Sequence, residues 1–140
     1  MTASIHSGFK QSAEKITGRI IRAMENPYVT AIGHPTGRLI GEREAYSFDI
    51  DRVLYAARHT GTALELNAYY QRLDSGDLLC RRAKESGVAI AIGTDAHSAE
   101  QMWMMELGVS TARRGWLEKR DVLNTLSAAG LLKFAGKKRV

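Results

Sequence analysis

The chain has 140 residues, of which 44% are hydrophobic, so it can bury the core of a single domain. It contains no apolar run long enough to span a membrane and no secretory signal pattern at its start, so we expect a cytoplasmic protein with no membrane partner. A net charge of +5 favours an anionic partner such as nucleic acid or a phosphorylated substrate. Part of that excess lies in segment 136–140, which could equally be a solvated tail. The single cysteine, Cys80, excludes a disulfide framework within one chain and is expected to fill the core.

Strands alternate with helices along the chain. Ser12 and Asp49 are expected to cap the starts of two helices, because their side-chain oxygens accept hydrogen bonds from free backbone N–H groups. Pro27 should end the first helix, and Gly61 and Gly87 should end the next two. The predicted elements are, in order, a strand at 2–7, a helix at 11–26, a strand at 28–34, a helix at 49–61, a strand at 62–68, a helix at 74–87, a strand at 88–97, and helical segments at 98–116 and 118–136.

This alternation predicts an α/β fold with parallel strands, either a doubly wound sheet or a barrel. Four such units are about half of an eight-fold barrel, which takes about 250 residues, so on the barrel interpretation the chain is a partial barrel. In the last helical segment, Val122, Leu123 and Leu126 are spaced to share one face. No linker interrupts residues 1–140, which we therefore expect to form one domain.

Polar side chains stand at the carboxyl ends of the predicted strands: His6, His34, Asn67, Asp95 and His97. The carboxyl ends of parallel strands meet at one rim, so these side chains are expected to converge there. Asp95 and His97 are two positions apart, and on an extended backbone both would point the same way. Three imidazoles and a carboxylate suit Zn²⁺, Mn²⁺ or Fe²⁺, although any one histidine could instead be a hydrogen-bonded structural residue.

Other polar residues are weaker candidates for roles near such a site. Glu65 and Asn67 share one face of a strand and could orient the metal ligands or water. Arg38 could grip a phosphate oxygen, or be a solvated loop residue. His59 lies in the last turn of a helix, where an imidazolium complements the helix dipole, so we assign it a structural role. Candidates for a nucleic-acid groove, with a solvated surface as the alternative, are Arg72, Arg113 and Arg114.

The motifs SIHSGF, GHPTGR, ELNA, GTDAH and STARRGW occur in this order between about residues 4 and 126. Together they resemble the C-terminal half of the PHP (polymerase and histidinol phosphatase) domain of bacterial family X DNA polymerases. The resemblance implies about four β/α units of a distorted (β/α)7 barrel, followed by C-terminal helices. It also implies that divalent ions, Mn or Zn, are bound by His6, His34, Asp95 and His97. Of these, His34, Asp95 and His97 would be catalytic, with Arg38, Glu65, Asn67 and Arg72 on the substrate side or behind the ligands.

The family resemblance implies a metal-dependent phosphoesterase that, in the complete domain, is a 3′–5′ exonuclease or phosphodiesterase acting on DNA. The alternatives are a small-molecule phosphomonoesterase of the histidinol phosphatase type, and a non-catalytic remnant or split subunit that binds DNA or a partner. The early histidine pairs, the bridging glutamate and the polymerase region of the family have no counterpart in this sequence. We therefore expect a complementary N-terminal half or a homo-oligomer to cover the open strand edges. Tyr69 and Tyr70 also depart from the family pattern.

Overall fold

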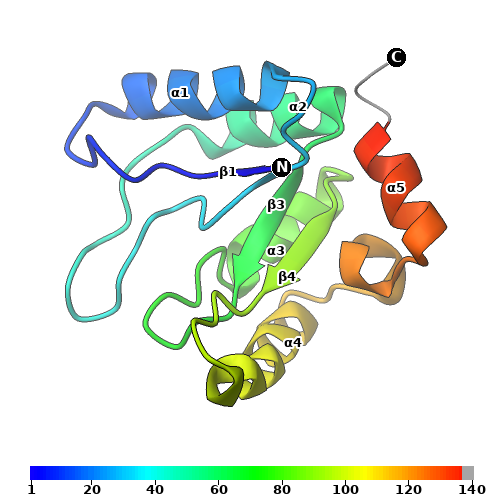
Figure 1. Ribbon diagram of the computed structural model, residues 1–140. Helices are drawn as coiled ribbons and strands as arrows, with labels where there is room; N and C mark the ends of the chain where they lie inside the picture. Colours follow the sequence, from blue (N-terminus) through cyan, green and yellow to red (C-terminus); the bar gives the residue numbers. More distant parts are fainter. Residues whose placement is uncertain (137–140) are drawn as a thin grey trace.

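Four parallel strands form one open sheet in the order β1-β2-β3-β4 in the computed structural model, which describes residues 1–136. Helices alternate with these strands (Figure 1), so the prediction of an α/β fold with parallel strands is confirmed, and the unclosed sheet is consistent with a partial β/α barrel. The strands are β1 (Thr2–Ala3), β2 (Ala31–Ile32), β3 (Ala63–Asn67) and β4 (Ile90–Gly93), the α-helices are α1 (Ala13–Glu25), α2 (Ile50–Thr60), α3 (Asp77–Glu85), α4 (Met105–Arg114) and α5 (Ala128–Gly136), and the short 3-10 helices are η1 (Ala99–Met104), η2 (Lys119–Asp121) and η3 (Leu123–Thr125).

The helix boundaries follow the residues that were expected to set them. Ser12 and Asp49 each accept a hydrogen bond from the backbone N–H three residues further on, which caps α1 and α2. Asn26, which precedes Pro27, has an extended backbone and ends α1. Gly61 adopts a left-handed conformation, with φ of 64°, after the last residue of α2. These four predictions are confirmed because each depends on the backbone preference of one residue.

Strands β1, β2 and β4 are shorter than the sequence predicted. The ladder between β1 and β2 ends where the Gly33 N–H donates to the Ala3 carbonyl at 2.8 Å. It cannot continue, because His34 has φ of 30° and Pro35 has no N–H to donate. Strand β4 ends in a similar way, since Asp95 has φ of 52°. The polar residues therefore lie in the turns just beyond the strands.

The segment 118–136 is not the continuous helix that was predicted. Val122 is extended, with φ of −113° and ψ of 120°, and its backbone forms a parallel bridge with Ile90 at the outer edge of β4. Two 3-10 turns flank this residue before α5 begins. Leu123 is buried whereas Leu126 is 42% exposed, so the prediction of one shared apolar face was wrong. A bridge to the sheet edge satisfies the backbone of Val122 as a helix would have done, and it covers part of that edge.

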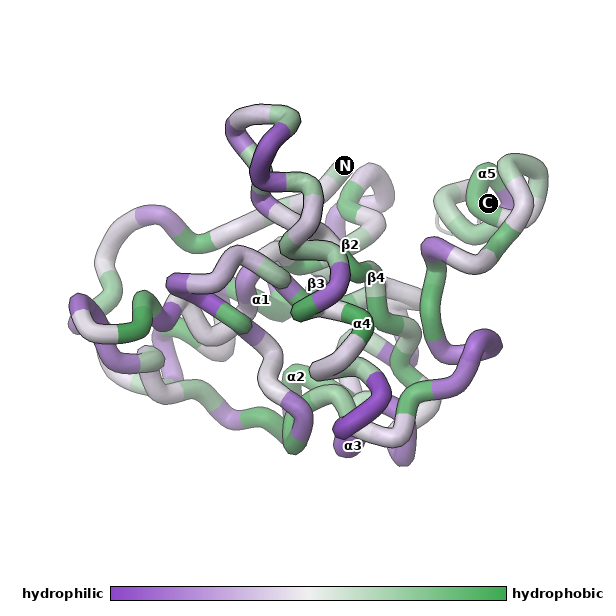
Figure 2. Tube along the Cα trace, turned by 90° about the horizontal axis from the view of Figure 1, so that it is seen from below, coloured by the Kyte–Doolittle hydropathy of each residue, from purple (hydrophilic) through white to green (hydrophobic). Residues whose placement is uncertain are grey.

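The large aliphatic side chains of the sheet pack on the face that α1 to α4 cover. Leu64 and Leu66 of β3 are fully buried there. Figure 2, seen from below, shows α1, α2 and α3 on one side of the strands and α5 apart on the other. Cys80 in α3 is fully buried, which confirms its expected place in the core, and this burial raises the pKa of its thiol to about 12. The helical residues of this core are Ile16, Ile20 and Met24 of α1, Val53, Leu54 and Ala57 of α2, Cys80 and Ala83 of α3, and Ala112 of α4.

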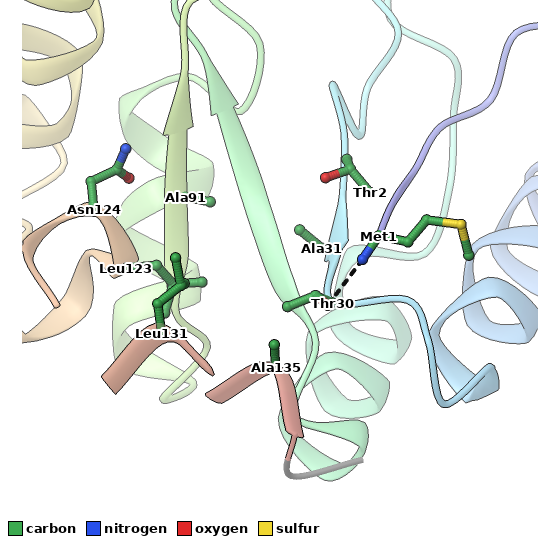
Figure 3. Close-up of a pocket in the computed structure, with 9 residues that line it drawn as sticks. All are labelled: Met1, Thr2, Thr30, Ala31, Ala91, Leu123, Asn124, Leu131 and Ala135. Atoms are coloured by element: carbon green, nitrogen blue, oxygen red, sulfur yellow. Dashed lines mark hydrogen bonds between the residues drawn. The ribbon is translucent and has the colours of Figure 1, made fainter. Parts of the chain in front are cut away.

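The opposite face of the sheet, the inner face, carries smaller side chains. Ala31 and Ala63 pack with Leu123, and Phe134 of α5 lies against this cluster. Figure 3 shows Leu131 and Ala135 of α5 facing this side of the strands, where they line a shallow hollow. The inner face is thus covered only in part, and mainly towards the amino ends of the strands.

No helix within residues 1–136 is long and apolar enough to cross a membrane. Residues 137–140, which make up most of the segment that we considered as a solvated tail, lie outside the described residues.

Candidate functional site

The predicted site residues lie at the carboxyl ends of the strands, which point to the lower end of the sheet in Figure 1. Asn67 is the last residue of β3. His34 and Asp95 lie in the turns that follow β2 and β4, and His6 lies beyond the end of β1. Their predicted placement at one end of a parallel sheet is therefore confirmed, whereas their role as metal ligands stays a prediction.

The imidazoles of His6 and His34 contact each other edge to face. Their ring centroids are 5.1 Å apart and the ring planes are inclined by 81°. His6 is exposed, but His34 is only 7% exposed and its Nδ1 is buried without a hydrogen-bond partner. Burial lowers the pKa of His34, and the nearby Arg72 guanidinium lowers it further. Both effects favour the neutral imidazole, which is the form that can donate a lone pair to a metal ion.

A chain of hydrogen bonds links the turns after β2 and β4 through β3. Glu65 Oε2 accepts from the His34 backbone N–H at 2.7 Å and from Asn67 Nδ2 at 3.3 Å. Asn67 Nδ2 also donates to Asp95 Oδ2 at 3.2 Å. A Cβ at Gly93 would collide with Glu65 Oε1, so the glycine leaves the space that the Glu65 carboxylate occupies. The predicted common face of Glu65 and Asn67 is confirmed, and both hold other rim residues in place.

Two arginines support the same region. Arg72 Nε donates to Asp95 Oδ2 at 3.2 Å, and Arg72 Nη1 is buried without a partner. Arg38 donates from Nε to the Arg72 carbonyl at 2.7 Å and from Nη2 to the Leu73 carbonyl. Arg38 is therefore not a solvated loop residue, because it braces the turn that carries Arg72.

Among the described residues, His97 has no hydrogen bond, ion pair or ring contact with the other candidate ligands. It is exposed, and its backbone N–H donates to Gln101 Oε1 at 2.7 Å. The positive φ of Asp95 breaks the extended backbone on which the expected pairing with His97 depended. Within residues 1–136, no group of three or more His, Cys, Asp or Glu side chains could hold a metal ion. The predicted convergence of four ligand-type side chains on one point is therefore not found.

Asp74 is a buried carboxylate near this rim that the sequence analysis missed. Its Oδ1 accepts from the backbone N–H groups of Thr36 at 3.0 Å and Ser75 at 2.6 Å, while Oδ2 has no partner. Burial, and then the charge of Asp74, raise the pKa of Tyr46. Asp74 fixes the loop after His34, but an aspartate just before a helix is also a common capping residue, so its sequence carried no signal of this role.

The remaining candidates lie outside this cluster. His59 Nδ1 is 2.8 Å from the Tyr55 carbonyl within α2, and its ring lies against the Tyr55 ring, which agrees with a structural role. Arg114 forms an ion pair with Asp77 at 2.9 Å, and Arg113 is exposed in the last turn of α4. Neither arginine has a contact with the rim residues among those that the structure describes.

An open parallel sheet with histidine, amide and carboxylate side chains beyond its carboxyl ends places the chain among α/β proteins and is consistent with a partial β/α barrel. The chain is 49% identical over 125 residues, 89% of its length, to the DNA polymerase/3′-5′ exonuclease PolX of Bacillus subtilis (strain 168). It is 36% identical over 118 residues to a probable phosphatase of Thermoanaerobacter sp. (strain X514). It spans 22% of the first relative and 46% of the second.

No family model matches the chain. Its similarity to PolX nevertheless confirms the resemblance drawn from its motifs: the chain is a relative of the PHP domain of bacterial family X DNA polymerases.

Proposed function

We propose that this chain is a single, partial PHP domain of a metal-dependent phosphoesterase, and that the complete domain is a 3′–5′ exonuclease acting on DNA ends. The observation that carries the proposal is the hydrogen-bonded chain from His34 through Glu65 and Asn67 to Asp95, at the rim where the unpartnered Nδ1 of His34 lies. The name of the Bacillus subtilis relative supports the choice of reaction.

The chemistry of the donor atoms fits a divalent cation. A buried imidazole nitrogen without a partner has lost its hydrogen bond to water and gained nothing in exchange. Coordination to a metal ion would compensate this loss. Paired imidazoles suit Mn or Zn, so His6 and His34 would hold one ion, Asp95 a second, and His97 a third or the substrate side. Further ligands would have to come from a complementary N-terminal half or a second chain. Such ions supply Lewis-acid activation of water and of the phosphoryl group.

The protein residues around these ligands orient them and bind phosphate. Glu65 fixes the backbone of His34, and Asn67 orients the Asp95 carboxylate. Arg72 holds Asp95 through Nε, and its guanidinium charge beside that carboxylate would attract a phosphate group. Arg38 keeps Arg72 in place through two backbone carbonyls.

The proposal is tested by placing this chain in the matching segment of the Bacillus subtilis relative and changing His34 to Ala. Mn²⁺-dependent removal of nucleotides from the 3′ end of a labelled oligonucleotide should fall by about 100-fold or more, since even residues behind metal ligands can contribute that much. His59→Ala is the matched control, because His59 is bonded within α2, and it should keep full activity. Unchanged turnover of a folded His34→Ala protein would rule out the assignment.

A second candidate is hydrolysis of a small phosphomonoester, as in enzymes of the histidinol phosphatase type. It is favoured by the Thermoanaerobacter relative, which is named a probable phosphatase. The same chimeric protein should then release phosphate from an aryl phosphate and leave oligonucleotides intact.

A third candidate is a non-catalytic remnant or one subunit of a split protein that binds DNA or a partner. The lack of a three-ligand group within the described residues favours it. The metal content of the purified 140-residue chain discriminates between these cases. Stoichiometric, tightly bound metal argues against a remnant, whereas metal retained only after a matching N-terminal fragment is added supports a split enzyme.

A further inference from the structure

Two adjacent tyrosines stand at the rim beside the candidate metal centre. Tyr70 is 52% exposed, whereas Tyr69 is half-buried. Their ring centroids are 5.0 Å apart, and the ring planes are inclined by 42°. Because the two rings are tilted rather than stacked on each other, a large part of Tyr70 remains accessible.

The backbone around this pair is firmly held. The Tyr69 N–H donates to Asn67 Oδ1 at 3.1 Å, and the Tyr69 carbonyl accepts from the Arg72 N–H at 2.7 Å. A neighbouring loop adds a further bond, from the Ile40 N–H to the Gln71 carbonyl at 2.6 Å. The aromatic pair therefore lies on a turn whose backbone is held by hydrogen bonds. Little backbone conformational entropy is lost when a ligand contacts this turn.

The same turn carries the cation proposed to bind phosphate. Arg72 reaches Asp95 through Nε and keeps a buried, unpartnered Nη1. An aromatic surface and a guanidinium two residues apart match the two parts of a nucleotide, since bases stack on aromatic rings and phosphates bind Arg.

We infer that Tyr69 and Tyr70 form a stacking platform for the last base of a nucleic-acid strand, so that they act as specificity-determining residues which favour a terminal nucleotide over a small aliphatic phosphate ester. The inference rests on the proposed phosphoesterase function, because it names residues that would select the substrate of that site. A small aliphatic ester would engage Arg72 and leave the platform unused. Exposed tyrosines are common on protein surfaces, so the argument depends on the pair lying in the same hydrogen-bonded turn as Arg72, which in turn binds Asp95.

The test measures binding and not hydrolysis, which separates it from the test of the proposed function. Two 5′-fluorescent abasic oligonucleotides of equal length and charge are used, one of which carries a single thymine at its 3′ end. Their affinities for the full 140-residue chain are compared by fluorescence anisotropy in EDTA at low salt. We expect the thymine probe to bind about 5-fold tighter or more, the lower limit for stacking of one base on an aromatic side chain.

Variants assign any preference to the platform. Tyr70→Ala should abolish the difference between the probes, whereas Tyr70→Phe should keep it, because the phenyl ring can still stack. Tyr55→Ala is the matched control, since Tyr55 is a 67% exposed tyrosine on α2, and it should behave like the unchanged chain. Circular dichroism checks that every variant is folded.

Equal affinity of the unchanged chain for both probes, or no binding of either, would overturn the platform and leave the proposed hydrolysis untouched. A preference that survives both Tyr70→Ala and Tyr69→Ala would place the base elsewhere and would also overturn it. Loss of nuclease activity in the His34→Ala chimera together with a Tyr70-dependent preference for thymine supports both assignments.

Discussion

The two faces of the sheet differ in what they bury. The face under α1 to α4 is packed with large aliphatic side chains such as Leu64 and Leu66. The inner face carries Ala63, Glu65 and Asn67 on the intervening positions of the same strand. Strand β3 therefore contributes aliphatic packing on one side and polar groups on the other. Substitutions on the two sides should differ in how much they lower the free energy of unfolding.

The largest expected effect is in the helix-covered face. Leu66→Ala removes a fully buried side chain and should lower the free energy of unfolding by about 2–5 kcal/mol, because a cavity is left that neighbouring helices cannot fill. Urea denaturation followed by circular dichroism measures this. Leu132→Ala, at a 74% exposed position of α5, is the control and should change stability by about 0.5 kcal/mol or less. Equal losses in the two variants would contradict the contrast between core and surface.

The next effect is on the inner face of the same strand. Glu65→Ala leaves the His34 N–H without its acceptor and removes one of the two acceptors of the Asn67 amide, which should cost about 1–3 kcal/mol in the same urea measurement. Glu85→Ala removes a carboxylate from an exposed ion pair with Arg81 and should cost less than about 1 kcal/mol. If Glu65→Ala were neutral, the polar network would not be a structural part of the inner face.

The third largest effect on stability is expected at the start of helix α1. Ser12→Ala removes the N-cap of α1 and should cost about 1 kcal/mol, because a free backbone N–H loses its acceptor. Ser12→Asp retains an acceptor and should keep the stability of the unchanged chain. A thermal melt of the three proteins tests both statements, and an Ala variant as stable as the Asp variant would contradict them.

The smallest effect is expected at the surface between α1 and α2. The ion pair of Arg52 with Glu14 joins these helices at 2.6 Å, and both side chains are largely exposed. A double-mutant cycle with Arg52→Ala and Glu14→Ala should give a coupling energy below about 1 kcal/mol that falls further as salt is added. A coupling as large as the Leu66 effect would mean that charge pairs, and not aliphatic burial, hold this layer together.

Much of the fold was predictable because its signals are local. Ser12 and Asp49 cap helices through contacts three residues away, and Gly61 ends a helix through its own backbone. The strand lengths were predicted less well, because the ladder ends at positive φ values of His34 and Asp95, and such values are uncommon for any residue other than glycine.

The placement of the candidate site residues was predictable, and their contacts were less so. The sequence places His6, His34 and Asp95 at strand ends, and parallel pairing brings those ends to one rim. It did not reveal that the backbone at Asp95 departs from the extended strand on which the pairing with His97 was based, since this depends on the turn. Nor did it assign Arg38 to the carbonyls of the turn that holds Arg72, because that contact joins residues more than 30 positions apart.

The sequence by itself determined the alternation of strands and helices, the helix caps and the kinds of side chain at the rim. Hydrophobic periodicity and backbone preference act over a few residues, so they can be recognised in a single sequence. Only the tertiary structure decided which rim residues meet, and it placed Arg72 on Asp95 and Glu65 on the backbone of His34. Those pairings depend on strand register and on the path of separate turns, and neither is a property of any short segment.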